Sequence, residues 1–176
     1  MFKLHGGMLL LLLAMSTPAA AEVVDAQPNG FALKYVYDIA RPREAVYRAI
    51  ADVSHWWDAS HSYSGQAGNL SLEARPGGCF CERLPGGGVQ HMVVIHANAP
   101  GQLTLQGGLG PLASLGVAGA MQWTLTERAG GTHLEVTYNI GGFQPGGLAA
   151  LAPMVDQVVG LQVKRLKTFA ETGRPE

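Results

Sequence analysis

Two different hydrophobic periods follow one another along this chain, and their order limits the folds that it can adopt. Apolar residues recur at every second position in 31–39 and in several short segments between residues 69 and 140. In 42–53 and again after residue 153 they recur at intervals of three and four. A period of two is typical of half-buried strands, whereas intervals of three and four indicate amphipathic helices. The sequence therefore predicts a strand, a helix, a series of short strands and a long final helix.

Glycine-rich turns at 85–88 and 129–131 separate neighbouring strand segments, which favours antiparallel hairpins. Val23 and Val24 are expected to pair with 31–39 across the Asn-Gly turn at 29–30. An antiparallel sheet with one buried face needs a cover, and the apolar stripe of the final helix can supply it. We therefore expect an α+β fold in which a curved antiparallel sheet wraps around a long C-terminal helix.

The first residues, MFKLHGGMLLLLLAMSTPAAAE, have the pattern of a secretory signal peptide. Lys3 precedes the apolar run 8–15, and alanines at 19–21 form a small-residue cleavage signal. The apolar run is too short to cross a bilayer. We expect a signal peptide at 1–21, a secreted or periplasmic protein without a transmembrane segment after cleavage, an N-terminal segment at 22–30 and a domain at 31–173.

The charge balance argues against a nucleic-acid partner. The chain has 12 Lys and Arg against 13 Asp and Glu, and its formal net charge is −1. Nucleic-acid-binding domains usually concentrate basic residues in a stripe or patch. The basic residues of this chain are scattered, so we expect no nucleic acid among its partners.

Several stretches resemble those of a known superfamily. They are RPREAVYRAIADVSHWW at 41–57, PGGCF at 76–80, APGQLTL at 99–105 and WTLTERAGGTHLEVTY at 123–138. With the order of elements, they resemble the START-like (SRPBCC) superfamily and its helix-grip fold, and most of all its polyketide cyclase-like and heat-shock ATPase activator-homologue branch. The resemblance implies a hydrophobic cavity between sheet and helix, used by members for lipids, sterols, polyketides or aromatic ligands. It implies no catalytic residues, because the superfamily shares no universal catalytic motif.

We therefore expect a hydrophobic or aromatic small molecule to bind in this cavity, without a cofactor. Apolar walls would provide affinity, and a few polar groups would fix the orientation of the ligand. The expected walls are Tyr35, Tyr37, Trp57, Met121, Trp123, Val136, Tyr138, Val155, Val159 and Gln162. The expected polar groups are His61, Tyr63, Glu82 and His91.

The stretch HWWDASHSYSG at 55–65 has two interpretations. Either one tryptophan fills the core while the other packs on the surface, or one lines the cavity with His61, Ser62 and Tyr63 at its rim. Asp58, Ser60 and His61 are triad residue types, but triad members normally converge from separate elements. We expect Asp58 and Ser60 to be turn formers that bond nearby backbone.

The stretch GGCFCERLPGGGVQH at 77–91 leaves three interpretations open for Cys79 and Cys81. On a regular strand their Cα atoms lie near the upper limit for a disulfide. Packing as free thiols is therefore favoured over a disulfide or redox pair, and over a metal site with His91. The hairpin register separates the polar sites. If Leu84 pairs with Val89 across the hairpin, Glu82 faces His91. If Leu84 pairs with Gly88 instead, Cys81 faces His91.

A Glu82–His91 pair would also suit general acid–base catalysis in a cyclase- or hydratase-like enzyme. An ordinary cross-strand charge pair is the competing interpretation. A third class, an interaction protein like the chaperone ATPase activators, is disfavoured by export because that chaperone is cytosolic. The Gly-rich segment 107–120 lacks phosphate-binding motifs. It is expected either to cover a cavity mouth as a mobile flap or to pack on the end of the sheet.

Overall fold

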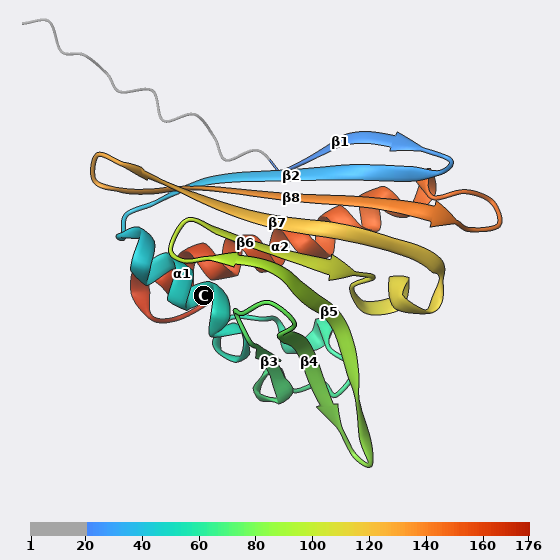
Figure 1. Cartoon of the computed structure of the whole chain (residues 1–176), viewed down its shortest axis with the longest axis horizontal. Coiled ribbons are helices and arrows are strands. Elements are labelled where there is room, and N and C mark those ends of the chain that lie inside the picture. Colours follow the sequence, from blue (N-terminus) through green and yellow to red (C-terminus); the bar gives the residue numbers. More distant parts are fainter. Residues whose placement is uncertain (1–20) are drawn as a thin grey trace, which may run out of the picture.

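The computed structural model describes residues 21–176, so the predicted signal peptide lies outside the described residues except for its last alanine. Strands and helices follow one another in the predicted order (Figure 1). The strands are β1 Ala21–Gln27, β2 Gly30–Ile39, β3 Leu70–Leu72, β4 Cys79–Leu84, β5 Gly87–Asn98, β6 Gln102–Gly107, β7 Gly116–Arg128 and β8 Gly131–Phe143. The helices are α1 Arg43–Ala51 and α2 Ala152–Thr172, with the short 3₁₀ turns η1 Val53–His55, η2 Ala59–His61, η3 Ala67–Asn69, η4 Gly110–Ser114 and η5 Ala149–Leu151.

All eight strands form one antiparallel sheet in the order β1-β2-β8-β7-β6-β5-β4-β3. The predicted hairpin at the N-terminus is confirmed, since Val23 pairs with Leu33. The first strand of the domain, β2, pairs with the last, β8, so two strands far apart in the sequence lie side by side. The sheet curves around α2, so the predicted α+β architecture is confirmed (Figure 1).

The long helix α2 covers the inner face of the sheet because one of its stripes is apolar. Val159, Val163 and Leu166 are buried, at spacings of four and three that place them on one side of the helix. The helix ends at Gly173, whose φ of 77° is left-handed and whose N–H donates to the carbonyl of Phe169 at 2.8 Å. This confirms the predicted stop. The shorter α1 packs beside the C-terminal half of α2 (Figure 1).

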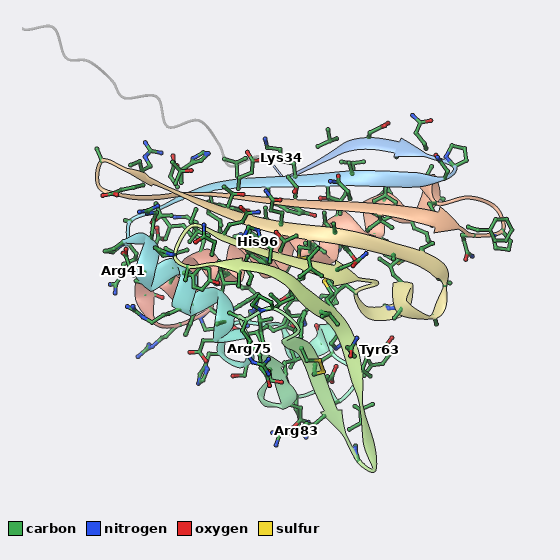
Figure 2. The ribbon with its side chains drawn as sticks, in the orientation of Figure 1. Lys34, Arg41, Tyr63, Arg75, Arg83 and His96 are labelled. Atoms are coloured by element: carbon green, nitrogen blue, oxygen red, sulfur yellow. A yellow bond between two sulfur atoms is a disulfide. The ribbon has the colours of Figure 1, made fainter. Side chains whose placement is uncertain are left out.

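The alternation predicted for the long strands is confirmed by their burial. Leu33 and Tyr35 of β2 and Leu134 of β8 are buried in the core, whereas Lys34 lies on the outer face and pairs with Glu135 at 2.7 Å (Figure 2). The outer face therefore carries the polar half of each strand, and the inner face meets α2. Within residues 21–176, none of the helices combines the length and the apolar character needed to cross a membrane.

Candidate functional site

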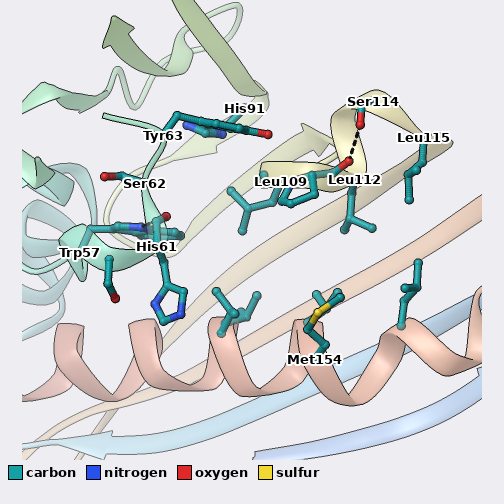
Figure 3. Close-up of a pocket in the computed structure, with 17 residues that line it drawn as sticks. Trp57, His61, Ser62, Tyr63, His91, Leu109, Leu112, Ser114, Leu115 and Met154 are labelled. Carbon is teal, nitrogen blue, oxygen red and sulfur yellow. Dashed lines mark hydrogen bonds between the residues drawn. The ribbon is translucent and has the colours of Figure 1, made fainter. Parts of the chain in front are cut away.

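A cavity of about 440 Å³ opens at one end of the molecule, between the first turns of α2 and two loop segments. Figure 3 shows Trp57, His61 and Tyr63 on one side, Leu109 and Leu112 on another, and Met154 on α2. Its lining residues are Trp57, Ser60, His61, Ser62, Tyr63, His91, Leu109, Gly110, Pro111, Leu112, Ser114, Leu115, Leu151, Met154, Val155, Val158 and Val159. A volume of this size lies within the usual range of small-molecule sites, roughly 300–1,000 Å³.

The helical wall of the cavity follows from residue spacing on α2. Val155, Val158 and Val159 stand at i, i+3 and i+4, which places all three on one side of the helix. The opposing wall is η4 with Leu109, which lies in the Gly-rich segment between β6 and β7. The Leu109 N–H donates to the buried Tyr138 hydroxyl at 3.0 Å, and that hydroxyl donates to the carbonyl of Gly107 at 3.2 Å. This segment thus lines the cavity and is anchored to the sheet, whereas its mobility stays a prediction.

The two adjacent tryptophans have different roles. Trp56 fills the core, and its Nε1–H donates to the carbonyl of Ala49 at 2.7 Å. Trp57 lines the cavity, and its Nε1–H donates to the carbonyl of His61 at 2.9 Å. One buried tryptophan and one at the cavity is the arrangement of the second sequence interpretation, in which His61, Ser62 and Tyr63 also lie at the cavity.

A buried glutamine ties this loop to α2. Gln162 was expected in the cavity wall, but its Oε1 accepts from the N–H of Asp58 at 2.8 Å, and its Nε2 lies 3.3 Å from Nδ1 of His61. The Asp58 carboxylate accepts from the N–H and the hydroxyl of Ser60 at 2.9 and 2.7 Å, which confirms the predicted turn. Hydrogen bonds from Ser60 hold the pKa of Asp58 below its usual value. Gln162 therefore positions the loop rather than lining the cavity.

Both predicted registers of the β4–β5 hairpin are wrong. Leu84 pairs with Gly87 and Glu82 with Val89, and the register then shifts so that His91 has no partner on β4. A β-bulge of this kind inserts an extra residue and redirects its side chain. As a result His91 and Met92 are both buried although they are adjacent. Turn geometry and a bulge fix this register, and the alternation of residue types carries no signal for either.

The bulge still brings the predicted pair together. Nε2 of His91 lies 3.1 Å from Oε2 of Glu82, and both side chains are buried. The two oxygens of Glu82 also accept from the N–H groups of Tyr63 at 3.1 Å and Ser64 at 2.5 Å. Burial raises the pKa of Glu82, but the hydrogen bonds from Ser64, Tyr63 and His91 outweigh burial and lower it. Glu82 is therefore an ionised carboxylate that reaches the cavity only through His91.

His91 is held as a neutral imidazole. Burial lowers its pKa, and this effect exceeds the opposing attraction of Glu82. The ring of Tyr63 stacks on it with centroids 5.9 Å apart, and Phe80 lies 5.2 Å away on β4. Because Nε2 faces the carboxylate, Nε2 carries the hydrogen and Nδ1 is left with its lone pair. Nδ1 is buried and has no hydrogen-bond partner.

The cysteines are paired, so the favoured prediction of free thiols is wrong. Cys79 and Cys81 form a disulfide with a Cα–Cα distance of 5.3 Å. The prediction assumed a regular strand, in which residues i and i+2 lie about 6.6 Å apart. β4 is contracted here, opposite the bulge of β5. Pairing also removes the two thiolates that a metal site with His91 would need. No group of three potential metal ligands is found within residues 21–176.

The residues expected to form the walls divide into two groups. Trp57, Val155 and Val159 line the cavity, as do the polar residues His61, Tyr63 and His91. The others lie outside it, and most are packed in the core beneath the long strands: Tyr35, Tyr37, Met121, Trp123, Val136 and Tyr138. Tyr35, for example, donates its hydroxyl to Oδ1 of Asp156 on α2 at 2.9 Å, and burial raises its pKa. These six residues therefore pack inside the protein and do not line the cavity, although they were expected to.

Several lining residues were missed by the sequence reasoning. They lie in η4 and around the start of α2: Leu109, Leu112, Leu115, Leu151, Met154 and Val158. All of them except Val158 belong to two long stretches, 97–126 and 136–155, that contain no Asp, Glu, Lys or Arg. In a stretch without charges, apolar residues outside the strands also need a buried or concave environment. The lack of charges in these two stretches is therefore a sequence signal for the cavity lining.

Solved structures share this arrangement of sheet and helix. An uncharacterised protein from Rhizobium leguminosarum is 19% identical, with a TM-score of 0.57, over 88% of this chain and 99% of its own. CalU16 from Micromonospora echinospora is 15% identical, with a TM-score of 0.55, over 91% of this chain and 88% of its own. The Aha1 dimer from Colwellia psychrerythraea is 14% identical, with a TM-score of 0.57, over 81% of this chain and 97% of its own.

The chain has the helix-grip fold. The predicted resemblance to START-like proteins is confirmed at the level of fold by these neighbours, which include CalU16 and the Aha1 dimer. No protein-family model and no curated protein matches the sequence. A shared fold at such low identity supports many different functions, so function has to be argued from the site.

Proposed function

We propose that this protein binds an uncharged apolar or aromatic small molecule in the cavity between α2, η4 and the loop after α1. The observation that carries the proposal is the lining of the cavity. Among the described residues that line it, none is Asp, Glu, Lys or Arg, and most are apolar or aromatic. Concave sites of this composition gain affinity from burial of apolar surface and orientation from a few polar groups.

Export to an oxidising compartment is part of this proposal. The N-terminal pattern at 1–21 supports it, and so does the Cys79–Cys81 disulfide, because disulfides persist mainly in exported proteins. Native mass spectrometry of protein purified from the exported fraction tests both export and ligand binding. We expect an N-terminus at Glu22 and additional mass that disappears on denaturation. A retained leader would contradict export.

Binding is tested with N-phenyl-1-naphthylamine, an uncharged aromatic probe whose fluorescence rises in apolar surroundings. Val155→Phe narrows the cavity, since Val155 lines it, and should weaken binding of the probe about tenfold or more. Gln157→Phe is the matched control, because Gln157 is exposed on the same helix and does not line the cavity. Absence of binding to the unmodified protein, or equal affinities of the two variants, would argue against the proposal.

A second candidate function is general acid–base catalysis by Glu82 and His91. It is favoured by the 3.1 Å contact between them and by the unpartnered Nδ1 lone pair. A carboxylate that orients an imidazole is a common arrangement for a general base. We propose this role as secondary, because among the described residues that line the cavity His91 alone contacts a buried carboxylate.

The catalytic role is tested with 5-nitrobenzisoxazole, an uncharged aromatic compound. A base removes its carbon-bound proton, the N–O bond breaks, and the resulting phenolate is followed by absorbance. If His91 acts as the base, the rate should rise with pH as the imidazole loses its proton, and Glu82→Gln should reduce it. A rate equal to that in buffer, or one unchanged in His91→Phe, would exclude this role.

A further inference from the structure

Most polar groups that line the cavity are already engaged within the protein. The hydroxyls of Ser60, Ser62 and Ser114 donate to Asp58, Ala59 and Pro111 at 2.7, 2.8 and 2.9 Å. Nδ1 of His61 lies 3.3 Å from Gln162. In contrast, Nδ1 of His91 is buried without any partner. Among the lining groups described, it is the buried polar atom that still needs a hydrogen bond.

The chemistry of this atom follows from the contacts of the other ring nitrogen. Nε2 donates to Glu82, whose carboxylate is held by two backbone N–H groups from the loop after η2. Burial keeps the pKa of His91 below its usual value, so the ring is neutral at physiological pH. Nδ1 is consequently a hydrogen-bond acceptor, and it can be satisfied only by a donor such as a hydroxyl or an N–H group.

An exposed side chain lies over one face of this imidazole. The Tyr63 ring stacks on His91 and is 53% exposed, although the Tyr63 backbone is anchored by its N–H bond to Glu82 (Figure 3). An exposed side chain changes its rotamer at little cost, whereas the backbone beneath it stays fixed. Tyr63 can therefore leave the imidazole without any change in the Glu82–His91 pair.

We propose that the ligand is an uncharged aromatic or alicyclic molecule with a hydroxyl group that donates to Nδ1 of His91. The inference rests on the proposed binding function and adds the class of ligand to it. An anionic ligand is disfavoured because the lining described contains no Lys or Arg, and a cationic one because it contains no Asp or Glu.

The test compares 2-naphthol with 2-methoxynaphthalene, which have similar apolar bodies but differ in the donor hydrogen. Calorimetric titration at pH 7.5 should give about tenfold tighter binding of 2-naphthol, since the ether leaves Nδ1 without a partner. In His91→Phe this ratio should fall to about one. His61→Phe is the matched control, because His61 also lines the cavity but its Nδ1 already faces Gln162; its affinities for both probes should change together.

A second measurement uses the unmodified protein, so it does not depend on whether His91→Phe folds. The ¹⁵N resonance of Nδ1 in His91 should shift on addition of 2-naphthol and should stay in place with 2-methoxynaphthalene. Equal affinities for the two probes with an unshifted resonance would overturn the inference and leave the binding function standing. Failure of both probes to bind would contradict the proposed function itself, and the ligand class with it.

Discussion

Beneath β2, β7 and β8 the space between sheet and helix is filled by the protein itself, whereas between η2, η4 and the start of α2 it is left open. In the first region Tyr35, Leu134 and Val136 have no exposed surface. In the second, Leu115 and Val155 are only partly buried and border a cavity of about 440 Å³. The same helix thus stabilises the fold with one half and forms a binding wall with the other.

The largest expected effect is a difference in unfolding free energy between two leucine truncations, one in each region. Leu134→Ala removes a fully buried side chain and should lower the free energy of unfolding by about 2–5 kcal/mol, because the packed core cannot close the void. Leu115→Ala enlarges a cavity that already exists and should cost about 1 kcal/mol or less. Urea unfolding of both variants measures the difference. Equal losses would mean that the two regions are packed alike.

The next effect concerns the buried carboxylate. Glu82→Gln keeps the shape of the side chain but replaces one acceptor oxygen by an NH₂ group. One of the N–H groups of Tyr63 and Ser64 then loses its acceptor. The free energy of unfolding should fall by about 1–3 kcal/mol. Glu135→Gln is the control, since Glu135 pairs with Lys34 on the outer face and such pairs contribute about 0–1 kcal/mol.

Replacing the disulfide should lower the free energy of unfolding only slightly, but it should change the backbone of β4. The Cys79–Cys81 ring encloses a very short loop, so the chain-entropy account gives it only about 1.5 kcal/mol. The double variant Cys79→Ala, Cys81→Ala should lose no more than this. Because β4 can then extend opposite the bulge, the ¹H–¹⁵N signals of His91 should move. Unchanged signals would mean that the bulge is fixed by the turn at 85–87 instead.

The smallest effect is the pH dependence of stability. The pKa of His91 is lowered by burial, so the unfolded chain takes up this proton before the folded one does. Its contribution to stability is complete above the usual histidine pKa and is lost as pH falls below it. The lowered pKa of Glu82 acts in the same direction at more acidic pH. The rings of Tyr63 and Phe80 are the aromatic groups that pack against this imidazole.

Unfolding free energies between pH 7.5 and 5.5 should therefore decrease, and part of the slope should disappear in His91→Gln. His96→Gln is the matched control, because His96 is an exposed histidine of the same strand (Figure 2). If His91→Gln and the unmodified protein showed the same slope, the imidazole would not be held neutral by its surroundings.

The sequence was sufficient to predict the elements and the sheet, because hydrophobic alternation reports which face of a strand is buried. Leu134, Val136 and Tyr138 are inward as predicted. The same signal does not distinguish a residue in a packed core from one that borders a cavity. Tyr35 and Trp123 were therefore placed in the wrong part of the interior, while the loop residues Leu109 and Leu112 were overlooked.

The pair of Glu82 and His91 was predicted for an incomplete reason. The contact was expected only if Leu84 paired with Val89. In the structure Leu84 pairs with Gly87, and the bulge in β5 brings Glu82 and His91 together. Bulges and disulfide-contracted strands depend on the local backbone and on covalent closure, and neither leaves a periodic trace in the amino-acid pattern. The contact itself remained foreseeable because both residues lie on one short hairpin.

The order in which the chain is made has a consequence for when this protein can hold a ligand. The inner helix is the last element, and the bond from Tyr35 to Asp156 joins residues that lie 121 positions apart. Contacts with such separation form late in folding, because a long loop must close before they are gained. The cavity therefore does not exist in a nascent chain that still lacks α2. Any ligand must be acquired where the completed protein finishes folding.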